Sequence, residues 1–212
     1  MTSGRFIAFE GGEGMGKSTQ ARMLADALEA RGVSTCLTRE PGGTSGAEAI
    51  RGLLLDPPGE GWTKEAEALL FAAARADHVA RLIRPALEEG RWVICDRFLD
   101  SSRAYQGAGG GLGDKTVRDL HTIGSDGLLP DMTLVIDAEA AEVDRRLTER
   151  DGGFSDAIGG RAAEYHASVN AAFRDFAVKE PDRFALIDGS GSMEDVHARV
   201  LHALSPLFVE SH

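Results

Sequence analysis

Residues 11–18, GGEGMGKS, have the composition and spacing of a loop that holds phosphate groups. Glycines allow successive backbone N–H groups to point at one anion, and a helix that follows adds the positive end of its dipole. Lys17 can reach the β- and γ-phosphates of a nucleotide, and the Ser18 hydroxyl can bind Mg²⁺. The pattern G-x-x-x-x-G-K-[ST] therefore predicts that a nucleoside triphosphate binds here. The residues expected at the nucleotide are Gly11, Gly12, Glu13, Gly14, Met15, Gly16, Lys17, Ser18 and Thr19.

An acidic residue, Glu13, stands inside this loop for anions. Its side chain can point out of the loop while its backbone N–H still points inward, so its presence does not exclude phosphate binding. A glycine-rich turn with a coincidental lysine is the alternative reading of the whole motif. Because kinases, molecular switches and motors all use such loops, the loop alone does not identify the acceptor.

A second group of reactive side chains follows the apolar run at residues 92–95. Asp96 is placed like a carboxylate that holds Mg²⁺ or one of its waters, and Arg97 can stabilise charge on a transferring phosphoryl group. The alternative is an Asp–Arg pair that caps a strand. The polar residues after it could contact a small ligand or serve as local caps, namely Ser101, Ser102, Tyr105 and Gln106.

Two further stretches point to a second ligand. TREPGGT, residues 38–44, follows an apolar run, and Pro41 with two glycines shapes a turn beside the cation of Arg39. In ALLFAAARADHV, Phe71 and Arg75 are four residues apart and share one helix face. An aromatic ring beside a planar guanidinium can stack on a base and hydrogen-bond its edge. A core phenylalanine beside a solvated arginine is the alternative.

The elements that position these groups alternate between strand and helix patterns. Nearly continuous apolar runs predict strands at 5–9, 33–38, 92–95, 133–137 and 184–187. Amphipathic stretches predict helices at 18–30, 47–55, 64–89, 114–123, 140–150, 162–177 and 193–207. This order predicts one α/β domain over residues 1–212, with helices on both faces of a parallel sheet. The glycine-rich residues 151–160 are either a mobile lid or a plain surface loop.

The composition excludes several classes of protein. The 212 residues carry 23 basic and 34 acidic side chains, a net charge of −11, which disfavours general binding to nucleic acid or anionic membrane. Cys36 and Cys95 lie in apolar runs and are expected to be packing residues without a disulfide. No signal peptide or apolar run of about 20 residues is present, so we expect a cytoplasmic protein with no membrane partner.

Four motifs in this order resemble the bacterial thymidylate kinases, a family of P-loop nucleoside monophosphate kinases: FEGGEGMGKST, TREPGGT, LLFAAAR and DRFLDSSRAYQG. The resemblance runs from about Phe6 to Leu204. It implies transfer of the γ-phosphoryl group of ATP to dTMP, giving ADP and dTDP, with Mg²⁺. It also implies a homodimer, a five-stranded parallel sheet and a short lid at about residues 150–162.

The resemblance implies roles for particular residues. Phe71 would stack on the thymine ring, Arg75 would bond its carbonyl edge, and Tyr105 would disfavour a 2′-hydroxyl. Glu13 would accept a hydrogen bond from the 3′-hydroxyl of the acceptor, unless it simply faces solvent. The residues expected at dTMP are Glu13, Pro41, Arg51, Phe71, Arg75, Arg97, Ser101, Ser102, Tyr105 and Gln106. Those expected to act in catalysis are Glu13, Lys17, Asp96, Arg97, Arg150 and Arg161, with Ser18 and Asp96 at the metal.

Two positions depart from the family pattern. Ala157 stands where the lid of many relatives carries an arginine, and Gly110 stands where another arginine is common. We therefore expect Arg150 or Arg161 to supply the missing cation. Three other functions remain open: a kinase for a different nucleoside monophosphate or for a deoxynucleoside, an ATP-dependent switch without an acceptor, and a scaffold with a vestigial site.

Overall fold

The computed structural model describes residues 4–139, 143 and 161–209. In this part of the chain, five strands form one parallel sheet in the order β2–β3–β1–β4–β5. The strands are β1 (Phe6–Glu10), β2 (Thr35–Arg39), β3 (Trp92–Asp96), β4 (Met132–Asp137) and β5 (Phe184–Asp188). The expected α/β fold with a five-stranded parallel sheet is therefore confirmed.

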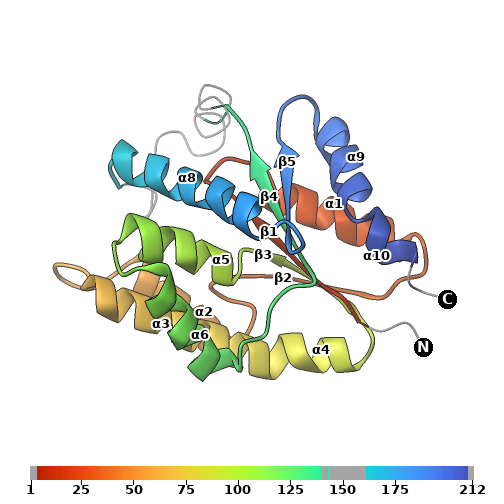
Figure 1. Ribbon diagram of the computed structural model, residues 1–212. Helices are drawn as coiled ribbons and strands as arrows, with labels where there is room; N and C mark the ends of the chain where they lie inside the picture. The colour runs from red at the N-terminus through yellow and green to blue at the C-terminus, as the bar shows by residue number, and fades with distance from the viewer. Residues whose placement is uncertain (1–3, 140–142, 144–160, 210–212) are drawn as a thin grey trace.

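The central strand β1 shows why these runs become strands covered on both faces. All five of its residues are buried, and alternate side chains enter different cores. Ile7 and Phe9 pack with α1 (Lys17–Glu29) and α9 (Met193–Ala203), whereas Phe6 and Ala8 pack on the other face. Figure 1 shows α1, α9 and α10 (Ser205–Val209) together on one side of the sheet.

A second set of helices covers the opposite face of the sheet (Figure 1). The face is covered by α3 (Lys64–His78), η1 (Val79–Ile83), α4 (Arg84–Glu88), α5 (Leu99–Ser102), η2 (Arg103–Gly109), α6 (Asp114–Ser125) and α8 (Ala163–Lys179). The remaining helix, α2 (Ser45–Leu55), packs against α3. None of the helices in the described ranges is long and apolar enough to span a membrane.

Two of the expected helices are divided at prolines. The helix expected at 64–89 widens into the π-helical turn η1 before α4 begins. Pro85 has no N–H to donate to the preceding turn, and the helix accommodates this by one wider turn. Pro206 likewise separates α9 from α10, which sequence patterning read as one helix over 193–207. The helix expected at 140–150 lies outside the described residues, except for Val143.

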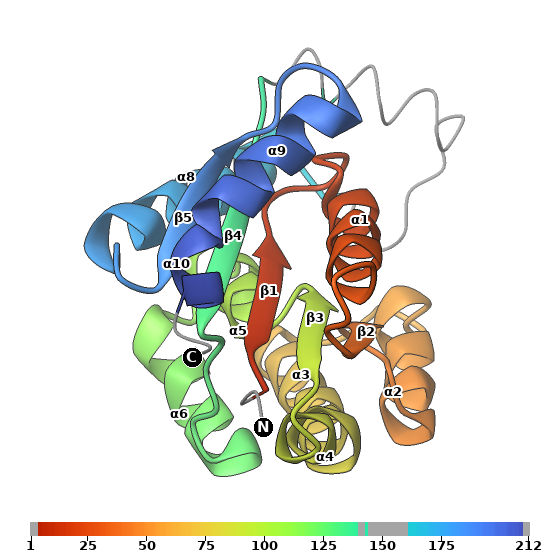
Figure 2. The same cartoon turned by 90° about the vertical axis from the view of Figure 1, so that its right-hand side faces the viewer.

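The carboxyl ends of three neighbouring strands carry the site. Figure 2 shows β1 and β3 running in the same direction, toward the loop that leads into α1. The pairing places Phe9 beside Asp96, and Arg39 at the end of β2 also lies beside Asp96. In open α/β sheets, ligands bind at the carboxyl ends of the strands, because loops from separate strands meet there. The phosphate loop, TREPGGT and the Asp96–Arg97 pair therefore converge.

Candidate active site

One cavity of about 400 Å³ opens at the carboxyl ends of β1, β2 and β3. It is lined by every residue expected at the acceptor, and by Gly14, Lys17, Ser18 and Asp96 of the expected donor and metal sites. Gly11, Gly12, Met15, Gly16 and Thr19 are not part of its wall. Met15 instead packs in the core beneath the loop, with 4% of its surface exposed. The volume suits a small ligand.

The phosphate loop has the backbone that its glycines make possible. Gly11 has φ 129°, and a Cβ there would lie 2.4 Å from the Ile136 carbonyl oxygen, so only glycine fits. Lys17 begins α1 and donates from Nζ to the Gly12 carbonyl oxygen at 2.5 Å. Burial, helped by the positive charge of Arg97, lowers the pKa of Lys17 to about 7. A bound phosphate would restore the charged form of this amine.

Ser18 and Asp96 form the part of the cavity that can hold a metal ion. The Ser18 hydroxyl donates to Asp96 Oδ2, while the buried Oδ1 of Asp96 has no hydrogen-bond partner among the described residues. Hydroxyl and carboxylate oxygens are the ligands that Mg²⁺ prefers, and this ion commonly takes one or two carboxylates together with substrate phosphates. The donor set therefore fits Mg²⁺.

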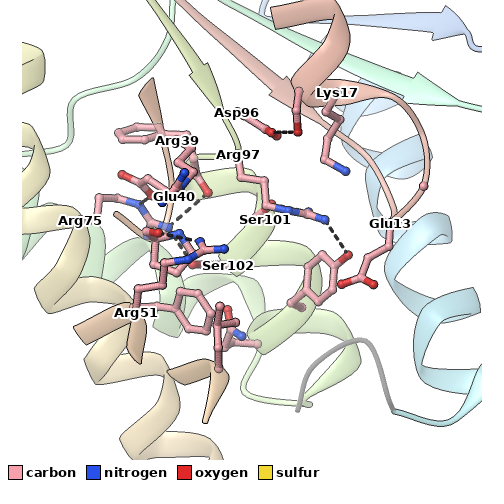
Figure 3. Close-up of a pocket in the computed structure, with 18 residues that line it drawn as sticks. Glu13, Lys17, Arg39, Glu40, Arg51, Arg75, Asp96, Arg97, Ser101 and Ser102 are labelled. Carbon is pink, nitrogen blue, oxygen red and sulfur yellow. Dashed lines mark hydrogen bonds and ion pairs between the residues drawn. The ribbon is translucent and has the colours of Figure 1, made fainter. Parts of the chain in front are cut away.

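Arg97 extends from the end of β3 across the middle of the cavity (Figure 3). Its backbone has φ 69°, a left-handed conformation that side-chain-bearing residues rarely adopt. The guanidinium donates to the Gly11 carbonyl oxygen and to Ser101 Oγ, each at 3.1 Å, and to the Tyr105 hydroxyl at 3.3 Å. These bonds hold the cation between the phosphate loop and the α5–η2 helix.

Glu10 supports this turn, although sequence reasoning did not single it out. Its buried carboxylate accepts from the backbone N–H of Phe98 at 2.8 Å, and from the Ser101 N–H and hydroxyl at 2.9 and 2.6 Å. Burial, reinforced by the negative charge of Asp100, raises the pKa of Glu10 to about 7. An acid closing an otherwise apolar strand was the available signal.

The far end of the cavity contains a buried arginine. Arg75 is 3% exposed, which excludes the solvated arginine that its helix spacing also allowed. It donates from Nε to Glu40 at 2.8 Å, and from Nη2 to Ser102 Oγ at 2.8 Å and the Phe98 carbonyl oxygen at 3.2 Å. Phe71 lies one turn before it and lines the same cavity. Glu40, the acid of TREPGGT, was also missed from sequence.

Two more cations line the side formed by α2. Arg51 donates from Nη1 to the Pro41 carbonyl oxygen at 2.8 Å, and Arg39 pairs with Glu48 at 3.1 Å. Figure 3 shows Arg39, Arg51 and Arg97 around the middle of the cavity, with Glu13 below Lys17 on the side where the Arg97 guanidinium ends. An anion can therefore bind locally in a chain whose net charge is −11.

The expected source of the lid cation falls largely outside the described part of the chain, which omits both Arg150 and Ala157. Arg161 is described, and its guanidinium pairs with Glu67 of α3 and donates to the Tyr165 hydroxyl at 2.5 Å. It is not among the residues that line the cavity. At Gly110 a Cβ would meet the Gln106 carbonyl oxygen at 2.8 Å, so an arginine there would require the backbone to shift.

Known proteins resemble nearly the whole chain. Residues 9–200 match the family model described as thymidylate kinase. The chain is 56% identical to the thymidylate kinase of Rhizorhabdus wittichii, over 96% of this chain and 98% of the relative. It is 47% identical to that of Chromohalobacter salexigens, over 94% of each. A crystal structure of thymidylate kinase from Ehrlichia chaffeensis superposes with a TM-score of 0.78 at 34% identity, covering 95% of this chain and 99% of that one.

Proposed function

The chain belongs to the thymidylate kinase family, which phosphorylates dTMP to dTDP with ATP, and we propose that the cavity described above is where it performs that reaction. The enzyme is thus a nucleoside monophosphate kinase acting in dTTP synthesis. The observation that carries the proposal is one cavity that joins Lys17 and Ser18 at one end to Phe71 and Arg75 at the other. A phosphoryl donor and a base-bearing acceptor can meet there.

At the donor end, the backbone N–H groups of the glycine loop and Lys17 hold the β- and γ-phosphates of ATP. The reaction needs little covalent chemistry from the protein, so positioning and charge neutralisation supply most of the rate enhancement. Ser18 and Asp96 would hold Mg²⁺, which neutralises charge on the phosphates when it is bound. Lys17 gains its proton as the phosphates approach, because their charge reverses the effect of burial.

At the acceptor end, Arg97 and Arg51 hold the dTMP phosphate in line with the donor. Arg97 lies between the two phosphates and neutralises charge as the phosphoryl group moves. Phe71 stacks on the base, and Arg75 donates to a carbonyl on its edge. The carboxylate of Glu13 accepts from the 3′-hydroxyl of the sugar, on the acceptor side of the loop. Tyr105 lies beneath the sugar.

A lid cation completes the proposed site. Arg150 or Arg161 supplies it, and for Arg161 this requires release from its ion pair with Glu67. Alanine substitution of each, measured by kcat, tests the assignment. A lost transition-state arginine costs about 10³-fold or more in other phosphoryl-transfer systems. Unchanged rates in both single variants and the double variant would exclude both residues.

We propose further that the protein acts as a homodimer in the cytoplasm, with residues 1–212 as one domain. Light scattering on the purified protein tests the dimer: a mass near 22.5 kDa at micromolar concentration would refute it.

The central experiment is an ADP-release assay with ATP and Mg²⁺, in which dTMP, dUMP, AMP, CMP and GMP are compared as acceptors. We expect stimulation by dTMP far above the other acceptors, since the base end offers a stacking ring beside a buried donor. An ATPase rate that dTMP does not raise would refute the activity, and faster turnover of another monophosphate would reassign the acceptor.

A further inference from the structure

Glu67, on α3, contacts two groups that matter to the site without lining the cavity itself. It lies four residues before Phe71 and eight before Arg75, so the three share one face of the helix. Its Oε1 accepts from Gln106 Nε2 at 2.8 Å, and its Oε2 pairs with Arg161. The side chain is 13% exposed. Glu67 therefore joins the base end of the cavity to the start of α8.

The bond from Gln106 determines which way its amide faces. A carboxylate accepts hydrogen bonds only, and both Glu67 oxygens act as acceptors, Oε1 from Gln106 and Oε2 from Arg161. Gln106 must then turn its Nε2 toward Glu67, which leaves its own Oε1 pointing away from Glu67. This oxygen is buried and has no partner among the described residues, although Gln106 lines the cavity and is 3% exposed. An unpaired buried acceptor is costly, so a ligand donor would satisfy it.

Arg75 lines the same cavity and offers a hydrogen-bond donor, whereas Gln106 offers an acceptor. The bonds that Arg75 makes to Glu40, Ser102 and Phe98 use Nε and Nη2, so its Nη1 can donate to a ligand carbonyl. A carbonyl beside a ring N–H, the arrangement in thymine and uracil, matches this donor and acceptor. Cytosine presents an amino group beside an unprotonated ring nitrogen and is mismatched at both positions.

We propose that Glu67 is a positioning residue that sets the hydrogen-bond polarity of the base site. By accepting from Gln106 Nε2, it commits Gln106 Oε1 to accept from the ring N–H of the base. The inference rests on the proposed binding of a pyrimidine monophosphate in this cavity. It adds that discrimination between imide and amino pyrimidines depends on a carboxylate that does not touch the substrate.

The test compares dTMP with 5-methyl-dCMP, which keeps the methyl group and the ring size but reverses both polar groups. The measured quantity is the ratio of kcat/KM for the two acceptors, with ATP saturating. In Glu67→Gln the amide oxygen can stay with Arg161 while Nε2 faces Gln106, so Gln106 is no longer committed to presenting Oε1 to the base. We expect the ratio to fall by about 10- to 100-fold, mainly through KM, because one buried polar mismatch is relieved.

Two further variants separate polarity from structure. Arg161→Met removes the ion pair but leaves the carboxylate, and it retains the wild-type ratio whatever its kcat. The double exchange Glu67→Gln/Gln106→Glu rebuilds the contact with donor and acceptor reversed, and it recovers the ratio. Thermal unfolding confirms that each variant is folded.

The proposal is overturned if Glu67→Gln keeps the ratio within about twofold of wild type. It is also overturned if Arg161→Met lowers the ratio equally, or if the double exchange discriminates no better than the single variant. A wild-type protein that does not turn over dTMP would instead refute the activity itself, which keeps the two failures distinct.

Discussion

Glu10 makes the stability of this protein depend on pH in a way that one isosteric substitution can isolate. Its carboxyl group is buried at the end of β1, and its pKa is raised from 4.5 to about 7. Burial is the larger cause, and the negative charge of Asp100 is the second. The folded protein therefore binds this proton more tightly than the unfolded chain does. The stability that results is fully present below pH 4.5 and is lost as the pH rises through about 7.

The size of the effect follows from the shift. A difference of one pKa unit corresponds to about 1.4 kcal/mol, so the difference of pKa at Glu10 amounts to about 3 kcal/mol of unfolding free energy. His121 acts in the opposite direction in an overlapping range: burial, and then the charge of Arg75, lower its pKa from 6.5 to about 4. Its contribution grows as the pH rises between these values. In the pH profile of wild-type stability, the contribution of His121 therefore partly cancels that of Glu10.

The assay is urea unfolding of wild type and Glu10→Gln between pH 4.5 and 8, followed by circular dichroism. Because His121 is common to both proteins, its contribution cancels in the difference. We expect wild type to lose about 3 kcal/mol relative to the variant as the pH rises across this range. Glu164→Gln removes an exposed carboxylate and is expected to track wild type at every pH. Parallel profiles for wild type and Glu10→Gln would refute a raised pKa at Glu10.

Three further predictions concern the phosphates and the acceptor. Since the pKa of Lys17 is about 7 in the free protein, ATP binding at pH 8 should take up close to one proton. This uptake makes the calorimetric binding enthalpy vary with the ionisation enthalpy of the buffer. A binding enthalpy that is the same in all buffers would contradict the lowered pKa. Glu13→Ala should raise KM for dTMP by about tenfold or more while leaving KM for ATP nearly unchanged, and equal effects on both would exclude the contact with the 3′-hydroxyl. Arg97→Ala should lower kcat by about 10³-fold with the fold intact, and a loss confined to KM would limit Arg97 to binding.

Much of the site was predictable because its signals are local. The glycines and lysine of the phosphate loop act through the backbone of one short segment, and the alternation of β1 side chains is a property of five consecutive residues. The four-residue spacing of Phe71 and Arg75 places both on one helix face wherever that helix packs. Such features depend on chain geometry alone, so the motif and the strand pattern carry them without knowledge of the fold.

The partners of the carboxylates that position the site could not be found in this way. Glu10, Glu40 and Glu67 each act on a partner that is 35 to 91 residues distant in the chain. Sequence spacing does not say which of 34 acidic residues will be buried against a given donor. Which acid becomes buried is decided when the strands pair in the order β2–β3–β1–β4–β5. This order brings the loops after β1, β2 and β3 together at the carboxyl ends of the strands.

The sequence by itself determined which functional groups are present and how they are placed locally. These are a phosphate loop, an Asp–Arg pair at a strand end, and a helix face that carries an aromatic ring and a guanidinium. What only the tertiary structure decided is the protonation and orientation of those groups. Burial lowers the pKa of Lys17 and raises that of Glu10, and the hydrogen bond to Glu67 orients the amide of Gln106. The physical reason is that desolvation and hydrogen-bond partners are properties of the packed surroundings, and residues remote in the chain supply them.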